Sequence, residues 1–315
     1  MPNRYSPVVV VAMLAVVALV VAIGAVSRGR ADAAERGDAE RLRVPGTWDV
    51  RGSVGPSDRS GVTRVAHRGA SGHAPENTIP AVELGIRQHA DLVEVDVQLT
   101  RDGVLVVMHD TTLKRTTDVE TYYPRRGPWR VKDFTYREIK QLDAGSWYGK
   151  EYAGTRVPTL QQVLDTLADS TAGLLLEVKA PKKYPGIGAK VAAALAEWPA
   201  WRDQGRRVVV CSFDWKFIKR FHTVMPSVET AVIGTPSLRE LPRIARYADQ
   251  VNPQFGSVDA AYLQRVHELG MDSYGWTVDE PEDMRTLIEL GSDGVITNKP
   301  DVLDELLYPS RPVAA

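Results

Sequence analysis

Cysteine is almost absent from the sequence, and neither sign of charge is in excess. The only cysteine, Cys211, excludes a disulfide within the chain. It lies in the apolar run 208–211, which favours a small buried side chain over a nucleophile. The 39 lysines and arginines nearly balance the 40 aspartates and glutamates, and no basic stripe stands out, so a nucleic acid is not an expected partner.

A glycine-rich dinucleotide-binding loop is also missing after the first expected strand. Apolar runs of strand length alternate with stretches of helical periodicity along most of the chain. The strand candidates are residues 63–67, 92–97, 174–179, 208–213, 230–234, 249–252, 272–278 and 293–297. The helical stretches include 78–89, 159–167, 186–197, 214–223, 237–247, 259–269 and 280–290. This alternation predicts an α/β fold, a TIM (β/α)8 barrel. The alternative is a doubly wound open sheet, against which the missing loop argues.

The N-terminal run 8–26 contains no charged residue. It is as long as a membrane-spanning helix and longer than the usual core of a signal peptide. We therefore expect residues 1–26 to anchor the protein in a membrane. A cleaved signal peptide is the alternative, because Ala31-Asp32-Ala33 could serve a signal peptidase. Both possibilities predict an extracytoplasmic protein, membrane-anchored or secreted.

Residues 27–61 are rich in charged residues, glycine and alanine and have no sustained apolar period, which is typical of a flexible linker. We expect the folded domain to span 62–308, followed by a short tail at 309–315. Within the domain, 111–157 interrupts the alternation of strands and helices. Such a long connection is usually functional, and we expect a cap beside the barrel mouth. The alternative is a surface excursion packed by its own aromatic residues.

Two carboxylates share one face of the expected strand 92–97. A strand has a period of two, so Glu94 and Asp96 point the same way. On an otherwise apolar strand the two carboxylates would repel each other, and a divalent cation bound between them would remove this repulsion. The alternative is that 92–97 is an edge strand whose carboxylates face solvent. Glu177, near the end of 174–179, would be a third ligand. An all-oxygen set suits Mg²⁺ or Ca²⁺ rather than zinc, with Ca²⁺ favoured in an extracytoplasmic domain.

Asp102-Gly103 lies between two strand-like runs and indicates a hairpin. If these two residues form the turn, Asp96 faces His109 across the hairpin. The returning strand 104–108 is then antiparallel to its predecessor and stands outside the main sheet. This register predicts that His109 lies beside the paired carboxylates.

His67 and Arg68 end the first expected strand, where α/β folds place their chemistry. His67 and His109 should therefore reach the same mouth, and two imidazoles beside a cation suit acid–base catalysis near neutral pH. Lys179 shares a face with Glu177. It either neutralises that carboxylate or joins Arg68 as a phosphate ligand.

Four short motifs match a known signature. They are His67-Arg68-Gly69, Pro75-Glu76-Asn77-Thr78, Glu94-Val95-Asp96 and His109-Asp110. Together they resemble the glycerophosphodiester phosphodiesterase family, and the resemblance extends over 62–308. It implies a divalent cation held by Glu94, Asp96 and Glu177. It further implies that His67 and His109 are the acid–base pair. Arg68 and Lys179 would bind phosphate, and Trp276 would line the substrate site.

Two positions depart from the family pattern. The usual Trp-Thr-Val-Asn ends here in Asp279, and the later Thr-Asp ends in Asn298. We expect neither residue to touch the acid–base pair or the metal ligands, so that only details of the substrate would be affected.

The resemblance implies metal-assisted hydrolysis of glycerophosphodiesters to glycerol 3-phosphate and an alcohol. Two other functions are compatible with the same barrel. One is a phospholipase-D-like hydrolysis of lysophospholipids, for which a membrane anchor would be suited. The other is a non-catalytic surface protein that binds phosphodiesters or wall polymers, but the intact histidines and carboxylates argue against it.

Overall fold

The computed structural model describes residues 61–202 and 207–309. The expected anchor at 1–26 and all but the last residue of the expected linker lie outside these ranges. None of the helices formed by the described residues combines the length and the apolar character that crossing a bilayer requires.

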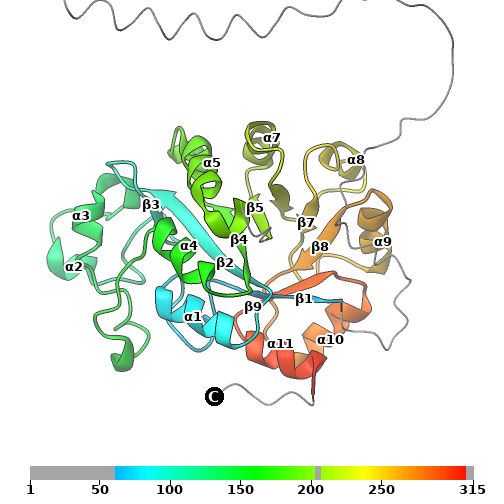
Figure 1. Cartoon of the computed structure of the whole chain (residues 1–315), viewed down its shortest axis with the longest axis horizontal. Coiled ribbons are helices and arrows are strands. Elements are labelled where there is room, and N and C mark those ends of the chain that lie inside the picture. Colours follow the sequence, from blue (N-terminus) through cyan, green and yellow to red (C-terminus); the bar gives the residue numbers. More distant parts are fainter. Residues whose placement is uncertain (1–60, 203–206, 310–315) are drawn as a thin grey trace, which may run out of the picture. The chain divides into compact units, whose positions relative to one another are not determined.

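Eight parallel strands form a closed barrel (Figure 1). They are β1 (Thr63–Ala66), β2 (Leu92–Leu99), β4 (Gly173–Val178), β5 (Val208–Ser212), β6 (Glu229–Ile233), β7 (Gln250–Asn252), β8 (Asp272–Gly275) and β9 (Gly294–Thr297). Strand β1 pairs with both β2 and β9, which closes the sheet on itself. The prediction of a TIM barrel is confirmed, and the doubly wound alternative is wrong. Each of the eight expected strands has a counterpart.

Helices surround the barrel (Figure 1). They are α1 (Ile79–Arg87), α4 (Leu160–Ala168), α5 (Ile187–Glu197), α6 (Pro199–Arg202), α7 (Trp215–Val224), α8 (Leu241–Ile244), α9 (Ala260–Glu268), α10 (Pro281–Glu289) and α11 (Pro300–Leu307), with the 3-10 helix η3 (Pro181–Lys183) after β4. The helix expected at 237–247 is reduced to α8. Pro242 fits only in the first turn of a helix, so α8 cannot extend further upstream.

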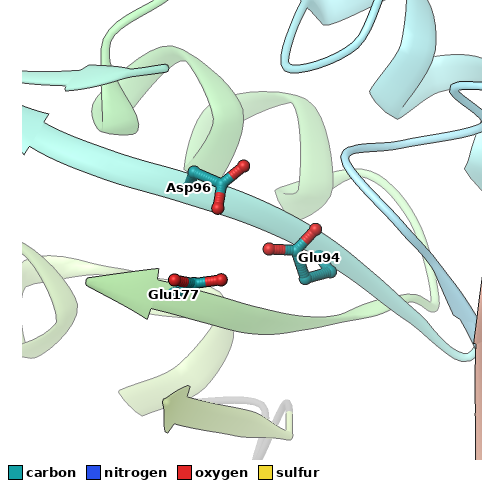
Figure 2. A group of neighbouring side chains, drawn as sticks. All are labelled: Glu94, Asp96 and Glu177. Carbon is teal, nitrogen blue, oxygen red and sulfur yellow. The ribbon is translucent and has the colours of Figure 1, made fainter. Parts of the chain in front are cut away.

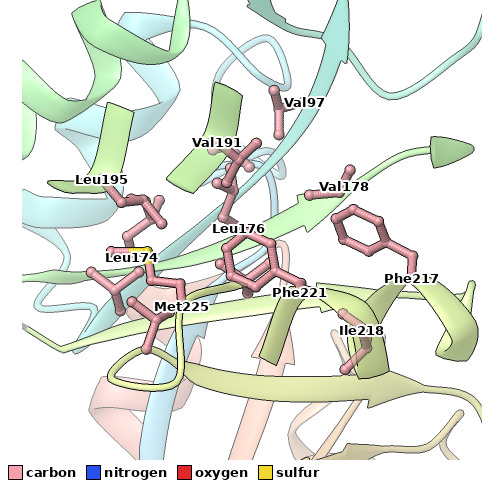
Figure 3. Packing of buried hydrophobic residues seen from close by; sticks show 14 of the residues in the cluster. Val97, Leu174, Leu176, Val178, Val191, Leu195, Phe217, Ile218, Phe221 and Met225 are labelled. Carbon is pink, nitrogen blue, oxygen red and sulfur yellow. The ribbon is translucent and has the colours of Figure 1, made fainter. Parts of the chain in front are cut away.

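The barrel has an apolar layer on each side of its sheet, because alternate strand residues point to opposite faces. Figure 3 shows the outer layer, where Leu174, Leu176 and Val178 of β4 face Val191 of α5 and Phe221 of α7. The inner layer fills the barrel. Its members are Val65, Leu92, Leu175, Val209, Cys211, Ala231, Ile233, Tyr274 and Ile296. Cys211 is thus a buried side chain of the barrel interior, as its apolar neighbours predicted.

The expected hairpin forms, but its register differs by one residue. Strand β3 (Leu105–Val107) runs antiparallel to β2, with Val97 opposite Val107. The connection has three residues, 101–103, instead of two, because Gly103 adopts a left-handed conformation with φ 77°. The prediction that Asp96 faces His109 is therefore wrong, and the Asp96 carbonyl instead accepts a hydrogen bond from the backbone of Met108 at 2.9 Å.

The insertion at 111–157 has a small core of its own, beside β3 (Figure 1). It contains the short helices α2 (Val119–Tyr122), η1 (Val131–Asp133), α3 (Tyr136–Ile139) and η2 (Lys150–Tyr152). The core is mainly aliphatic, while Tyr122 and Trp147 are exposed, so the insertion is not packed chiefly by aromatic residues. The Tyr152 hydroxyl donates to the carbonyl of His73 at 2.8 Å, which ties the insertion to the loop after β1.

Candidate active site

Three carboxylates converge at the C-terminal end of the barrel. Glu94 and Asp96 lie on β2, and Glu177 lies on the paired strand β4, directly beside Asp96 in the register. Each offers an oxygen, and these oxygens lie within 4.8 Å of one another. Figure 2 shows the three side chains on the same side of the two neighbouring strands. All three are buried, so their charges are poorly screened by water.

The charges on this cluster are incompletely balanced within the protein. Burial and repulsion by Asp96 and Glu177 raise the pKa of Glu94 well above its ordinary value. Burial and Asp96 raise the pKa of Glu177 to about 7. Burial also acts on Asp96, but the charges of Lys179 and Arg68 outweigh it and lower the pKa of Asp96. A divalent cation would supply the missing positive charge, and the all-oxygen donors fit Mg²⁺ or Ca²⁺.

Two basic residues adjoin the carboxylates. The ammonium group of Lys179 lies 2.7 Å from Glu177 and 3.4 Å from Asp96. The Arg68 guanidinium lies 3.5 Å from Asp96, while its backbone N–H donates to Glu94 at 2.7 Å. The ion pair expected as one role of Lys179 is therefore present. The side chains of Lys179 and Arg68 are both close enough to the carboxylates to contact a phosphate bound there.

Asn77 is a site residue to which the sequence analysis gave no role beyond its place in a motif. Its amide donates to the Asp96 carboxylate at 2.7 Å and accepts from the Asp96 backbone N–H at 3.0 Å. The next residue of the motif, Thr78, caps α1. Asn77 has φ 58°, a conformation that asparagine tolerates better than most residues, which suits it to this turn. Its place in the Pro-Glu-Asn-Thr motif was the available signal.

His67 is held by a residue that was expected to lie away from it. The ring Nδ1 is 2.7 Å from Asn298 Oδ1. The Asn298 amide nitrogen donates to Asp279 at 2.6 Å, which leaves its oxygen to face the ring. The expectation that neither departure from the family pattern touches the acid–base pair is wrong, because β9 pairs with β1 and so brings Asn298 beside His67.

This contact determines the tautomer of His67. Since Asn298 presents an acceptor, Nδ1 must carry the proton, and Nε2 keeps its lone pair. Burial and the positive charge of Arg68 lower the pKa of His67 to about 4. The ring is therefore neutral at physiological pH and able to accept a proton at Nε2.

His109 has a charged partner instead of a neutral one. Its Nδ1 lies 2.8 Å from Asp110 Oδ1. Arg115 donates twice to Asp110, at 2.8 and 3.0 Å, and twice to Glu76, at 2.8 and 2.7 Å. Glu76 in turn accepts from Arg68 at 2.9 Å. Hydrogen bonds from Arg115, and then from His109, lower the pKa of Asp110 to about 2, so this carboxylate is ionised.

A buried side chain of β2 fixes the backbone around His109. The buried Gln98 donates to the carbonyls of Met108 and Asp110 at 2.7 Å each and contacts the His109 carbonyl at 3.2 Å. The Tyr184 hydroxyl donates to the Gln98 carbonyl oxygen at 2.6 Å. The loop that carries His109 therefore has little freedom to move away from the site.

Several of the groups described above line one cavity of about 100 Å³. Its charged and titratable side comprises His67, Arg68, Glu94, His109, Glu177 and Lys179. Its apolar side comprises Leu175, Cys211, Phe213, Ile233, Trp276 and Ile296. The rings of Phe213 and Trp276 meet edge to face with centroids 5.6 Å apart. Phe213 and the lining residue Asn252 were not singled out from the sequence, because neither belongs to a recognisable motif.

Residues 67–302 match the model of a protein family described as the glycerophosphoryl diester phosphodiesterase family. Two similar proteins are named glycerophosphodiester phosphodiesterase. That of Caldanaerobacter subterraneus subsp. tengcongensis is 36% identical over 246 residues, which cover 77% of this chain and 96% of the relative. That of Bacillus subtilis strain 168 is 33% identical over 272 residues, which cover 81% and 89%.

Solved structures show the same similarity. An Oleispira antarctica phosphodiesterase, determined in complex with the product sn-glycerol-3-phosphate, superposes with a TM-score of 0.68 at 27% identity. The alignment covers 78% of this chain and 96% of that one. A glycerophosphodiester phosphodiesterase from Agrobacterium tumefaciens gives a TM-score of 0.64 at 27% identity, covering 76% and 98%.

Proposed function

Because the chain belongs to the glycerophosphoryl diester phosphodiesterase family, we propose that it hydrolyses glycerophosphodiesters to glycerol 3-phosphate and an alcohol. The observation that carries this proposal is the convergence of two histidines on a cluster of three buried carboxylates, of which Glu94 and Glu177 line the same cavity as the histidines. The related Oleispira antarctica phosphodiesterase, whose structure contains sn-glycerol-3-phosphate as product, supports the same substrate class.

Glu94, Asp96 and Glu177 would hold one divalent cation, Mg²⁺ or Ca²⁺, which would supply positive charge to the phosphate and lower the pKa of the attacking hydroxyl. Arg68 and Lys179 bind the non-bridging phosphate oxygens from the same side of the cavity. Their charges oppose the negative charge that builds on phosphate oxygens during displacement.

The two histidines divide the proton transfers. His67 is neutral with a free Nε2, so it accepts the proton of the attacking hydroxyl, which belongs to water or to the glycerol unit. As the new P–O bond forms, the bond to the departing alcohol breaks. Attack by water gives glycerol 3-phosphate directly, whereas attack by the glycerol hydroxyl gives a cyclic phosphate that water then opens to the same product. His109 gives a proton to the departing oxygen, and the ionised Asp110, 2.8 Å from its Nδ1, orients the ring for this transfer.

The test compares two substrate classes on the purified protein. Glycerophosphocholine and lysophosphatidylcholine are each incubated with the enzyme, with and without EDTA. We expect release of glycerol 3-phosphate and choline from glycerophosphocholine, abolished by EDTA and restored by Mg²⁺ or Ca²⁺. Faster turnover of the lysophospholipid would favour the phospholipase-D-like function, and no turnover of either would favour a binding protein.

We also propose that the enzyme acts outside the cytoplasm, held at the membrane by residues 1–26 or released after their cleavage. The uncharged run 8–26 supports this placement. Cell fractionation with N-terminal sequencing distinguishes the anchored from the secreted form. Recovery of the full-length chain in the cytosolic fraction would contradict both.

A further inference from the structure

Asn252 is a buried amide whose polar atoms lack partners. The residue is 1% exposed at the C-terminal end of β7. Neither Nδ2 nor Oδ1 has a hydrogen-bond partner among the described residues, yet the side chain lines the active-site cavity. Burying an amide without partners is costly, so a group with this exposure normally meets a ligand or water.

The backbone of Asn252 is firmly placed. Its carbonyl accepts from the Gly234 N–H at 2.9 Å and from the Trp276 indole at 2.8 Å. The preceding residue, Val251, packs in the outer apolar layer, so alternation along β7 directs Asn252 into the barrel. The unpartnered amide is therefore a fixed feature of the cavity wall and not a side chain that turns outward.

Asn252 lies opposite the carboxylate cluster. In the closed sheet β7 is four strands from β2 in either direction, so Asn252 faces Glu94 and Asp96 across the barrel. The wall around Asn252 is apolar and includes Ile233 and Trp276. A phosphate bound by Arg68 and Lys179 therefore occupies the opposite side, and Asn252 is left for a neutral part of the substrate.

We infer that Asn252 determines specificity by binding the terminal hydroxyl of the substrate's glycerol unit, an inference that rests on the proposed function. An amide offers one donor group and one acceptor, and a hydroxyl can satisfy both. The terminal hydroxyl is the part of the glycerol unit furthest from phosphorus, so it is the group that reaches the far wall. The neighbouring Trp276 ring covers the carbon chain between them.

The test removes the hydroxyl and the amide separately and together. Wild type, Asn252→Leu and Asn252→Ser are assayed with saturating Mg²⁺ or Ca²⁺ on glycerophosphocholine and on 2-hydroxypropyl phosphocholine, in which a methyl group replaces the terminal CH₂OH. We expect wild type to prefer the parent substrate about 10- to 100-fold in kcat/KM, since the analogue leaves the amide unpaired. Asn252→Leu should bring this ratio to about one, and Asn252→Ser should give an intermediate ratio.

Ile233→Val provides a control on the same wall, because Ile233 pairs with Asn252 in the register and lines the cavity without a polar group. It should change kcat/KM for both substrates by the same factor. Calorimetric binding of sn-glycerol 3-phosphate and of 2-hydroxypropyl phosphate gives the same comparison without turnover. The preference for the hydroxylated ligand should disappear in Asn252→Leu.

The outcomes separate this inference from the proposed function. If wild type hydrolyses glycerophosphocholine but its preference is unchanged in both variants, Asn252 does not bind the hydroxyl and only ordered water occupies its amide. If wild type shows no preference, the terminal hydroxyl is not recognised at all. If wild type does not hydrolyse glycerophosphocholine, the proposed function itself fails. Circular dichroism establishes that each variant is folded.

Discussion

Asn298 Oδ1 lies 2.7 Å from Nδ1 of His67, and this single contact decides which nitrogen of the ring can act as a base. The Asn298 amide is oriented by Asp279, which accepts from both its side chain and its backbone, at 2.6 and 2.8 Å. The Asn298 amide thus separates the negative charge of Asp279 from the His67 ring. Burial and the charge of Arg68 lower the pKa of His67, and the hydrogen bond with the neutral Asn298 amide offsets only part of that shift.

Replacing this neutral acceptor by a charged one should move the pH profile. Asn298→Asp places a carboxylate beside the ring, which favours the imidazolium and raises the pKa of His67 from about 4. The base must be neutral to work, so the acidic limb of kcat/KM should shift to higher pH and activity at low pH should fall. Asn298→Leu, which adds no charge, should show no upward shift. An unmoved acidic limb in Asn298→Asp would mean that His67 is not the base.

The two histidines should act as a unit. His67→Ala and His109→Ala should each lower kcat by ~10²–10⁴-fold, the usual contribution of a general acid or base. The double variant should lose little more than either single variant, because both groups serve one transition state. Bis(4-nitrophenyl) phosphate has a leaving group that barely needs a proton, so it should rescue His109→Ala but not His67→Ala. Rescue of the opposite variant would exchange the two roles.

The carboxylate cluster should respond in opposite ways with and without cation. In EDTA, Glu94→Gln removes a carboxylate that Asp96 and Glu177 repel. The variant should therefore have a higher melting temperature than wild type. With saturating Mg²⁺ or Ca²⁺, wild type should gain stability in proportion to the logarithm of cation concentration over Kd, and the variant should gain less. Glu83→Gln, an exposed site on α1, should change neither value. Equal cation-induced shifts in wild type and Glu94→Gln would remove Glu94 from the site.

Arg64 should be important for stability and not for turnover. It lies on β1, is largely buried, and pairs with Asp91 at 2.7 Å and with Asp304 of α11. Arg64→Ala removes the cation shared by these carboxylates, and the free energy of unfolding should fall by about 3 kcal/mol. Urea denaturation measures the loss, and Arg87→Ala on the exposed face of α1 is the control. The kcat of the folded variant should equal that of wild type.

His267 should make stability depend on pH. Its hydrogen bond to Asp293, at 2.8 Å, raises the pKa of His267 above its ordinary value. The folded chain then holds this proton more tightly than the unfolded chain. The resulting stability is fully present below about pH 6.5, the unfolded value, and is lost as the pH rises through the folded pKa.

His267→Gln should therefore destabilise the protein more at about pH 5.5 than at about pH 9, as measured by urea denaturation. His89 is exposed and has φ 60°, a conformation that asparagine also accepts, so His89→Asn is a matched control. The control should show the same effect at both pH values. A pH-independent effect of His267→Gln would show that its role is packing alone.

The barrel could be predicted from sequence because each of its strands leaves a local signal. Buried parallel strands are short apolar runs between helices, and the carboxylates of β2 and β4 stand out in such runs. The hairpin register could not be predicted, because Asp102-Gly103 fits both a two-residue and a three-residue turn. The three-residue turn forms because only Gly103, and not Asp102, takes a left-handed φ.

The missed site residues have a different explanation. Asn298 reaches His67 only because β9 pairs with β1, a contact between residues 231 positions apart. Asn252 can be recognised only from the missing hydrogen-bond partners of its buried amide, and this property leaves no sequence signature. Both are properties of the closed barrel, in which the order of strands around the cavity brings distant strand ends together.

The position of Arg115 limits how this enzyme could exchange parts with its relatives. Arg115 belongs to the insertion at 111–157, whereas its partners Glu76 and Asp110 belong to the barrel loops that carry Arg68 and His109. An insertion transplanted without an arginine at this place would remove the side chain that joins Glu76 to Asp110, leaving Glu76 with Arg68 and Asp110 with His109. Recombination that alters the cap must therefore transfer Arg115 with it, or replace both of its carboxylate partners at once.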